Sequence, residues 1–246
     1  MGPACTQRND DGVVTYEVFR VNGVQHRPPE DGPAITQLAP DGALLVQYMV
    51  HGVSHRPPEA GPATIKRNHN GVLLYEQFIV NGEAHRPAED GPALTRCNHD
   101  GVVVTEEYIV HGQRHRPPED GPAWTRRKKG GLIEEFCTNG KMHRPPKDGP
   151  AWLKRNRDGI VVEESFRVHG VYHRPPEDGP ALIRRNANNA VLEEHFAVGG
   201  VLHRPPHDGP ALIRRDNYGN VVSECYRLWG EPNRPIKDGP MVTTRN

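Results

Sequence analysis

The chain has 246 residues, carries 31 Lys+Arg and 31 Asp+Glu, and is 35% hydrophobic and 6% aromatic. Zero net charge argues against a nucleic-acid partner, because proteins that bind the phosphate backbone carry a basic excess, and no apolar run approaches the ~20 residues of a membrane span. With 26 Gly and 25 Pro, the chain has little material for a thick globular core.

A single motif recurs along the whole chain and sets its organisation. Its commonest form is His-Arg-Pro-Pro-Glu-Asp-Gly-Pro-Ala, and successive copies start 28 to 30 residues apart. The motif histidines are His26, His55, His85, His115, His143, His173 and His203, and Asn233 takes the eighth place. We therefore predict one repeat domain over residues 1–246. Its units are about 2–31, 32–60, 61–90, 91–120, 121–148, 149–178, 179–208 and 209–238, with a partial unit at 239–246.

Each unit is predicted to consist of strands joined by tight turns, as the sixth unit illustrates. Residues 151–155 read as a short strand, 156–159 as an Asp-Gly turn, and 160–168 as a longer strand rich in β-branched residues. Residues 169–170 form a second turn, 171–174 a third short strand, and the following prolines end it, because proline cannot donate to a ladder. No helix is expected. The fold class is all-β, an elongated, solenoid-like antiparallel meander of eight ~30-residue units with two to three strands each.

The repetition of the motif bears on whether it is a catalytic site. An active site is normally one asymmetric constellation of groups with different roles, whereas a residue present in every unit usually builds the unit. We therefore interpret His-Arg-Pro-Pro-Glu-Asp-Gly-Pro as an architectural joint. A ligand-binding feature repeated in every unit is the alternative.

Alternation along the long strand places a glutamate on the same face as an aromatic residue two positions later, as in Glu164 and Phe166. A buried glutamate needs a partner, and the motif supplies an arginine with equal regularity. We predict that each inner glutamate forms a structural ion pair with a motif arginine or histidine, in its own unit or the next, with acid–base catalysis by Glu and His as the alternative. The glutamates are Glu17, Glu76, Glu106, Glu164, Glu194 and Glu224, and the arginines are Arg27, Arg86, Arg116, Arg174 and Arg204.

Metal and disulfide chemistry are not indicated. Equivalent histidines of neighbouring units would lie roughly 10–14 Å apart, too far to share one zinc ion with its ligands ~2 Å away. The four cysteines have no CxxC spacing and are interpreted as reduced thiols. We expect no catalytic residues, no cofactor and no metal. We also expect a cytoplasmic location, with a virion or another assembled layer as the alternative.

The segment Gly159-Ile-Val-Val-Glu-Glu-Ser-Phe-Arg-Val-His-Gly-Val-Tyr-His-Arg174 resembles a variant MORN-type repeat. The resemblance covers the whole chain, although the Pro-Pro-Glu-Asp-Gly-Pro insertion lengthens the unit and the usual Tyr-Glu-Gly signature is missing. It implies an elongated β-sheet assembly with scaffold or partner-binding roles, and some bacterial relatives are antitoxin-like. The lipid binding attributed to some MORN proteins would need a basic excess, which this chain lacks.

Positions that vary between units are the better candidates for binding, because the repeated ones build the scaffold. The face opposite the glutamates is apolar in the first four units and charged in the last three. Exposed apolar patches often mark interaction surfaces. The alternative is that the chain itself covers this face. The candidate partner-binding residues are Tyr16, Leu45, Met49, Tyr75, Ile79 and Ile109.

These observations predict a non-enzymatic repeat scaffold that binds a protein partner or a second copy of itself. The alternative is a structural subunit of a filament or of a viral or cellular layer. It is suggested by the absence of polar caps, since open edge strands can pair head to tail. A third, weaker hypothesis is a hydrolase that uses His and Glu.

Overall fold

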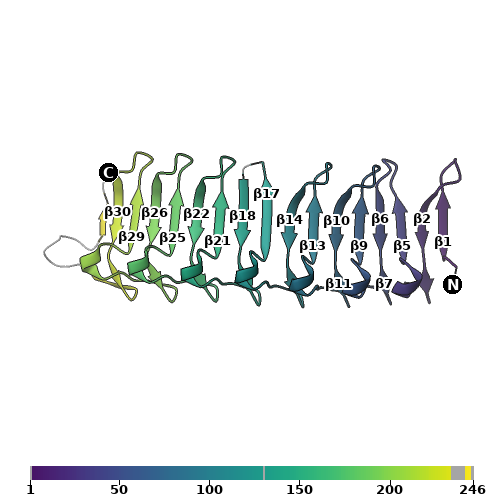
Figure 1. Ribbon diagram of the computed structural model, residues 1–246, viewed down its shortest axis with the longest axis horizontal. Coiled ribbons are helices and arrows are strands. Elements are labelled where there is room, and N and C mark those ends of the chain that lie inside the picture. Colours follow the sequence, from purple (N-terminus) through teal and green to yellow (C-terminus); the bar gives the residue numbers. More distant parts are fainter. Residues whose placement is uncertain (1, 130, 234–241, 245–246) are drawn as a thin grey trace. The chain divides into compact units, whose positions relative to one another are not determined.

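The computed structural model describes residues 2–129 and 131–233 and the backbone of Val242–Thr244. Their secondary structure is β apart from one-turn 3-10 helices, which confirms the predicted all-β antiparallel meander (Figure 1). The chain divides into two compact units, residues 1–116 and 117–246, where the sequence predicted one repeat domain. The eighth motif beyond Asn233 and most of the fragment 239–246 lie outside the described residues.

In the first unit, eight long strands pair antiparallel in chain order. They are β1 (Cys5–Arg8), β2 (Val14–Val18), β5 (Ile35–Leu38), β6 (Leu44–Gln47), β9 (Thr64–Arg67), β10 (Leu73–Gln77), β13 (Leu94–Cys97) and β14 (Val103–Glu107). Each repeat also has a short hairpin: β3 (Arg20–Val21) with β4 (Val24–Gln25), β7 (Met49–Val50) with β8 (Val53–Ser54), β11 (Ile79–Val80) with β12 (Glu83–Ala84), and β15 (Ile109–Val110) with β16 (Gln113–Arg114).

The second unit repeats this plan. Its long strands are β17 (Trp124–Lys128), β18 (Gly131–Glu135), β21 (Trp152–Arg155), β22 (Val161–Ser165), β25 (Leu182–Arg185), β26 (Val191–His195), β29 (Leu212–Arg215), β30 (Val221–Cys225) and β33 (Val242–Thr244). Its short hairpins are β19 (Cys137–Thr138) with β20 (Lys141–Met142), β23 (Arg167–Val168) with β24 (Val171–Tyr172), β27 (Ala197–Val198) with β28 (Val201–Leu202), and β31 (Arg227–Leu228) with β32 (Glu231–Pro232).

The predicted strand 160–168 is divided in two at its aromatic residue. The N–H of Phe166 donates to the carbonyl of Ala181 in the next repeat, and its carbonyl accepts from the N–H of His173. Phe166 therefore leaves the ladder of β22, and β23 pairs only with β24 in a separate sheet. Each complete described repeat consequently has two long and two short strands. The sequence predicted two to three strands for each repeat because the second long strand and the first short strand, here β22 and β23, read as one strand in the sequence.

Turn chemistry explains both kinds of hairpin. At the short hairpins Asn22 and Gly23 have φ of 52° and 81°, the two positive angles of a type I′ turn. In several long hairpins the side chain of an asparagine or aspartate accepts hydrogen bonds within the turn: Oδ1 of Asn156 accepts from the N–H groups of Asp158 and Ile160, both at 3.0 Å, and Asp216 does the same from Tyr218 and Asn220. These Asn and Gly positions fix the hairpin lengths and hence the period of the repeat.

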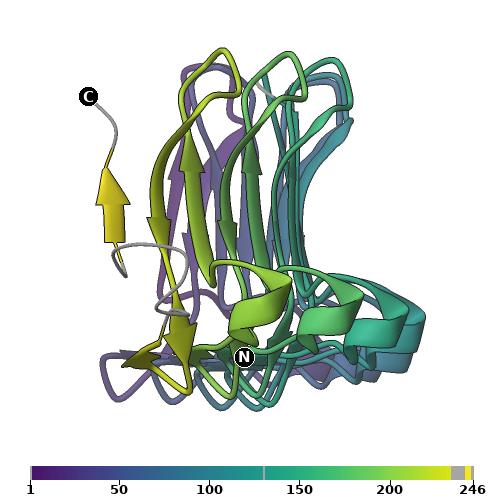
Figure 2. The same ribbon diagram turned by 90° about the vertical axis from the view of Figure 1, so that its left-hand side faces the viewer.

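A one-turn 3-10 helix follows each described motif arginine, although no helix was predicted. Each is three residues long, too short to show in hydrophobic periodicity, and proline at its start supplies a suitable φ. The helices are η1 (Pro29–Asp31), η2 (Pro58–Ala60) and η3 (Ala88–Asp90) in the first unit, and η4 (Pro118–Asp120), η5 (Pro146–Asp148), η6 (Pro176–Asp178) and η7 (Pro206–Asp208) in the second. Figure 2 shows these turns gathered with the short hairpins at one end of the long strands.

The core is thin and is built around the alanine of the motif. Ala63 is fully buried because its N–H donates to the carbonyl of Gln77 and its carbonyl accepts from the N–H of Tyr48. The chain is therefore held between strands of two repeats at this residue. The equivalent residues are also 0% exposed: Ala34, Ala93, Ala123, Ala151, Ala181 and Ala211.

Enlarging one of these alanines should destabilise the protein. We expect Ala63→Val to cost about 1–3 kcal/mol, the usual penalty for overpacking a filled core. Ala60→Val, three residues earlier and exposed, is the matched control and should change stability little. Urea denaturation followed by far-UV circular dichroism measures both, and equal midpoints for the two variants would contradict this account of the core.

Candidate functional site

The motif arginine stacks on the aromatic residue of its own repeat. The guanidinium carbon of Arg27 lies 3.8 Å from the centre of the Phe19 ring, and Nη1 donates to the carbonyl of Pro33 at 3.2 Å. The same contact, at 3.9 to 4.0 Å, occurs in the pairs Arg56–Tyr48, Arg86–Phe78, Arg116–Tyr108, Arg144–Phe136, Arg174–Phe166 and Arg204–Phe196. A desolvated cation–π contact stabilises by about 2 kcal/mol.

Glycine closes the other side of this arginine. A Cβ built on Gly61 would lie 3.0 Å from Nη1 of Arg56, and the φ of Gly61 is 113°, which L-residues rarely adopt. The guanidinium is thus enclosed by a ring, a glycine backbone and a proline carbonyl. This arrangement uses Arg and Gly-Pro of the motif to hold the chain at the corner of the repeat.

The predicted pairing of motif arginines with the inner glutamates is wrong for Arg27, Arg86, Arg174 and Arg204. In the part of the chain that the structure describes, none of these four has a carboxylate within 4.0 Å. Burial lowers the pKa of Arg174, while Glu164 acts from a greater distance to raise it. The ring is a closer partner than the carboxylate because the chain turns at the aromatic residue.

In the second unit, three inner glutamates instead pair with an arginine of the following repeat. Glu164 on β22 lies 2.6 Å from Arg185, the last residue of β25, and Glu194 lies 2.6 Å from Arg215. Glu134 and Arg155 form a longer pair at 3.7 Å. These arginines recur every 30 residues, and this spacing was the sequence signal that could have identified them as partners of the inner glutamates. These ion pairs join consecutive repeats.

The same position in the first unit holds no cation opposite Glu17 or Glu76. Leu38 and Cys97 end the strands that follow these two glutamates. Burial and then the charges of Glu76 and Glu106 raise the pKa of the Cys97 thiol. Glu17, Glu76 and Glu224 are half-buried and form no ion pair with a described residue. Among the described residues, Glu17 and Glu76 therefore lack the ionic link that Glu134, Glu164 and Glu194 make to the following repeat.

The motif histidine connects each repeat to the next. Nδ1 of His26 accepts a hydrogen bond of 3.1 Å from the N–H of His51, the turn residue of the next short hairpin. The same bond, at 3.1 to 3.3 Å, is made by His55, His85, His143, His173 and His203. Several of the rings also stack, as in His85 and His111 at 4.3 Å. An accepting Nδ1 carries no proton, so this link requires neutral imidazole.

The candidate partner-binding residues fall in two places. Tyr16, Leu45 and Tyr75 lie in one row across the long strands of the first unit. Met49, Ile79 and Ile109 lie beyond the turn, in the short hairpins. Ile109 is only 9% exposed and packs with Phe78 and Ala93, so at this residue the chain itself covers the face, as the alternative interpretation expected.

Exposed side chains alternate along the row with half-buried ones and, at its end, with buried Thr105. Its members, in order from β1 to β14, are Gln7, Tyr16, Gln37, Leu45, Lys66, Tyr75, Arg96 and Thr105, which we call the varied row. Gln7, Gln37, Lys66 and Arg96 are exposed, and Arg96 lies over the Tyr75 ring. The predicted apolar stripe is therefore interrupted by polar residues from the first strand of each repeat.

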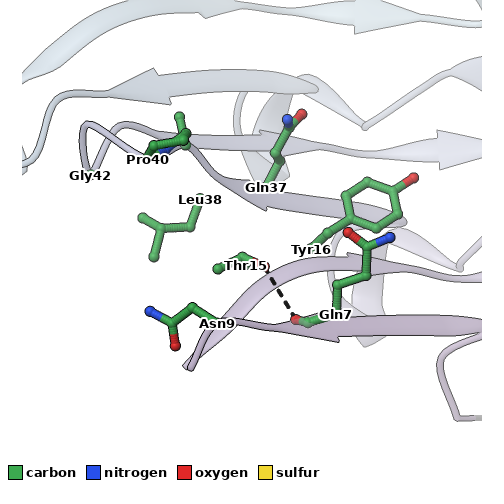
Figure 3. A pocket seen from close by; sticks show the side chains of 9 residues that line it. Gln7, Asn9, Thr15, Tyr16, Gln37, Leu38, Pro40 and Gly42 are labelled. Atoms are coloured by element: carbon green, nitrogen blue, oxygen red, sulfur yellow. Dashed lines mark hydrogen bonds between the residues drawn. The ribbon is translucent and has the colours of Figure 1, made fainter. Parts of the chain in front are cut away.

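A groove opens at the beginning of the varied row. It has a volume of about 490 Å³ and is lined by residues that include Gln7, Thr15, Tyr16, Gln37 and Leu38, none of them charged (Figure 3). Gln7 and Gln37 are the cross-strand neighbours of Tyr16 on its two sides. An aromatic ring between two amides offers both apolar contact and hydrogen bonds to a bound group.

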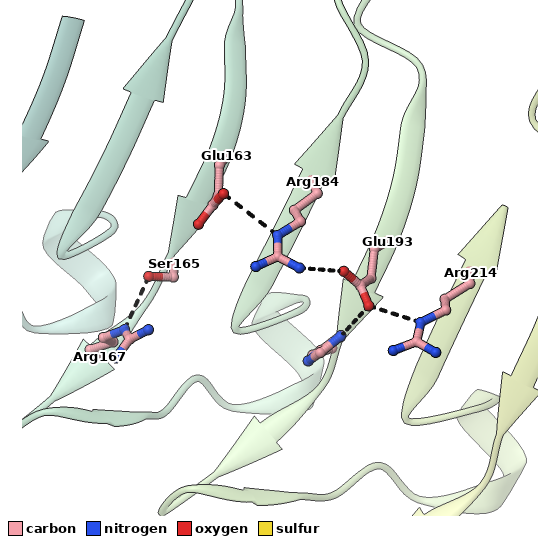
Figure 4. Close-up of polar contacts among 7 residues, drawn as sticks. Glu163, Ser165, Arg167, Arg184, Glu193 and Arg214 are labelled. Atoms are coloured by element: carbon pink, nitrogen blue, oxygen red, sulfur yellow. Dashed lines mark hydrogen bonds and ion pairs between the residues drawn. The ribbon is translucent and has the colours of Figure 1, made fainter. Parts of the chain in front are cut away.

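The corresponding row of the second unit is ionic (Figure 4). Arg184 lies 3.5 Å from Glu163 and 2.8 Å from Glu193, which also contacts Arg214 at 2.9 Å. Burial acts to raise the pKa of Glu193, but hydrogen bonds from His195, Arg214 and Arg184 lower it to about 2. These charges neutralise one another along the sheet, so this row is a structural ladder.

No family model matches the chain, and no curated protein matches its sequence. The resemblance to MORN-type repeats stays a prediction. Within the described residues, no helix is long and apolar enough to span a membrane, and no three His, Cys, Asp or Glu side chains are grouped as metal ligands would be.

Acid should weaken the histidine links between repeats. Burial, and then the charge of the facing imidazole, lowers the pKa of His85, opposite His111, and of His143, opposite His169. Because the folded pKa lies below the unfolded value of ~6.5, this stability is fully present above pH ~6.5 and is lost as the pH falls toward the folded pKa. The melting temperature should therefore fall between about pH 7.5 and about pH 5.5.

The variant His85→Gln/His143→Gln is the control for this effect. Glutamine keeps an acceptor but cannot be protonated in this range, so its melting temperature should fall less over the same interval. A wild-type melting temperature that is flat across this range, or an unchanged slope in the variant, would contradict the assigned links.

Proposed function

We propose that the protein is a non-enzymatic repeat scaffold that binds a protein partner or a second copy of itself. The single observation that carries the proposal is that the motif residues make the structural contacts of the repeat, whereas the residues of the varied row do not. The motif His, Arg, Gly-Pro and Ala are engaged in joints within and between repeats, which leaves none of them poised for acid–base chemistry. The varied row differs in side-chain chemistry from strand to strand and plays no part in these joints.

The varied row has features that suit protein recognition. Tyr and Arg are enriched at interface hot spots, and the row has Tyr16 and Tyr75 with exposed Arg96 beside the second. The groove next to Tyr16 could receive one side chain of a partner. Amide and cationic neighbours would provide the polar rim that surrounds such anchors.

The test replaces the apolar members of the row. We expect Tyr16→Ser/Leu45→Ser/Tyr75→Ser to remain folded but to lose capture of its partner from an extract of the source organism, measured by quantitative mass spectrometry. Val13→Ser/Val102→Ser removes apolar groups that are 47% and 56% exposed and lie outside the row, so it should capture the partner as the wild type does. Identical capture profiles for all three proteins would contradict the assignment of the row.

A structural subunit that assembles head to tail is the second candidate. It is favoured by β1, whose four residues are exposed and which pairs only with β2 among the described strands. An open strand edge presents unpaired N–H and C=O groups to another chain.

Assembly of this kind depends on concentration. Sedimentation velocity should show a growing series of oligomers as concentration rises, and Thr6→Pro, which removes an N–H from β1, should shorten the series. One sedimenting species at all concentrations would rule out the structural-subunit candidate.

A further inference from the structure

The charges of this neutral chain are unevenly divided between its two units. Residues 1–116 carry 10 Lys+Arg and 14 Asp+Glu, whereas residues 117–246 carry 21 and 17. The first unit therefore has a net charge of −4 and the second a net charge of +4. Two copies of the chain thus have complementary halves.

The excess positive charge has a defined location. Arg126, Arg127, Lys128 and Lys129 end β17 and begin its turn, and all four are exposed. Lys154 joins them on the neighbouring hairpin, because Arg126 and Lys154 are both paired with Ile133 across the sheet. We call these five residues the basic tip.

The fold does not explain the basic tip. The described motif arginines stack on rings, and Arg184, Arg185 and Arg214 are engaged by glutamates. The residues of the basic tip form no ion pair with any described residue. Arg126, Lys128 and Lys154 share one face of the sheet, where like charges repel one another, and this arrangement is unfavourable unless an anionic partner binds them.

The matching acidic surface lies in the first unit. Glu30, Glu59 and Glu89 occupy the same position of η1, η2 and η3, and Asp31 and Asp90 follow the first and third of them. All five are exposed and unpaired among the described residues. We call them the acidic corners. In the second unit the Glu position reads Glu119, Lys147, Glu177 and His207, each followed by Asp, so three consecutive turns with Glu at this position occur only in the first unit.

The two surfaces share one period. Successive corners are two strand spacings apart along the sheet, and so are Arg126 on β17 and Lys154 on β21, which gives both sets a spacing of about 10 Å. Charges that repeat with the same spacing can pair in register along two rows. Within each unit the hairpin tips and the 3-10 turns lie at opposite ends of the long strands (Figure 1).

We propose that the basic tip of one copy binds the acidic corners of a second copy. This inference rests on the self-association part of the proposed function and assigns its surfaces. The contact joins two different surfaces, so it either closes into a ring or propagates into a filament or layer. Exposed ion pairs are individually weak, so the contact requires several in register and is sensitive to salt.

Complementary charge reversal tests the proposal. Variant A is Glu30→Lys/Glu59→Lys/Glu89→Lys, and variant B is Arg126→Glu/Lys128→Glu/Lys154→Glu. All six residues are exposed, and circular dichroism checks that both variants fold. By sedimentation velocity at low salt, we expect the wild type to associate, each variant alone to be monomeric, and an equimolar mixture of A and B to associate again.

A charge-matched control separates the specific contact from net charge. Asp10→Lys/Asp11→Lys/Asp100→Lys changes the net charge as variant A does, at exposed carboxylates outside the acidic corners. It should associate alone as the wild type does. Raising the salt to about 1 M, where the Debye length is about 3 Å, should dissociate the wild type.

Three outcomes would overturn the inference. They are a wild type that is monomeric at low salt, variants that associate alone as the wild type does, or a basic tip that binds anionic vesicles or duplex DNA without self-association. A monomeric wild type would leave the scaffold proposal standing, because loss of partner capture by the varied-row variant is measured independently. If the varied-row variant captured the partner as the wild type does while association still depended on charge, the scaffold proposal would fall and the charge contact would stand.

Discussion

Each described repeat depends on the guanidinium of its motif arginine, which is held between an aromatic ring and a glycine. The chain has few large apolar side chains, and the motif arginine supplies packing at each corner instead. Its planar guanidinium covers the aromatic ring and Nη1 donates to a proline carbonyl, as in Arg174 with Phe166 and Pro180. Arginine suits this position better than lysine because its guanidinium is flat and weakly hydrated. The enclosed head fixes the turn of the chain at the aromatic residue. That turn separates the long strands from the short hairpins and so defines the two-part repeat.

The joints within a repeat and the links between repeats use different chemistry. Ring, guanidinium and glycine act inside one repeat, whereas the histidine Nδ1, the backbone N–H of the motif arginine and, in the second unit, Glu–Arg pairs reach the next repeat. Stability in such an array is a sum of repeat and nearest-neighbour terms. The second unit has ionic links at Glu134, Glu164 and Glu194, which Glu17 and Glu76 of the first unit lack.

Much of the fold was accessible from the sequence, because Gly-Pro spacing, Asn-Gly turns and alternation are local signals. The strands 151–155 and 171–174 were predicted to within two residues of β21 and β24. The division of 160–168 was not, because Phe166 leaves its ladder through bonds to residues of the next repeat and the corner. The turn of the chain at Phe166 is also the reason that the ion pairs were predicted with the wrong arginines. Once the chain turns at Phe166, Arg174 meets the ring, and Glu164 is left for Arg185. Likewise Ile109 varies between repeats, yet its burial follows from packing against Phe78.

Repetition constrains where function can evolve in such a molecule. A change at a motif residue disturbs a joint, whereas a change in the varied row or at a hairpin tip alters one strand and leaves its neighbours paired. The departures from the repeat are concentrated at such positions: an uncharged groove beside Tyr16, and four consecutive cations at the hairpin where the repeat shortens to 28 residues. Weak contacts at these places gain strength from the period, because a partner that matches one repeat in spacing meets the next in register. A second copy of the chain has the same period, which is why we propose it as the partner.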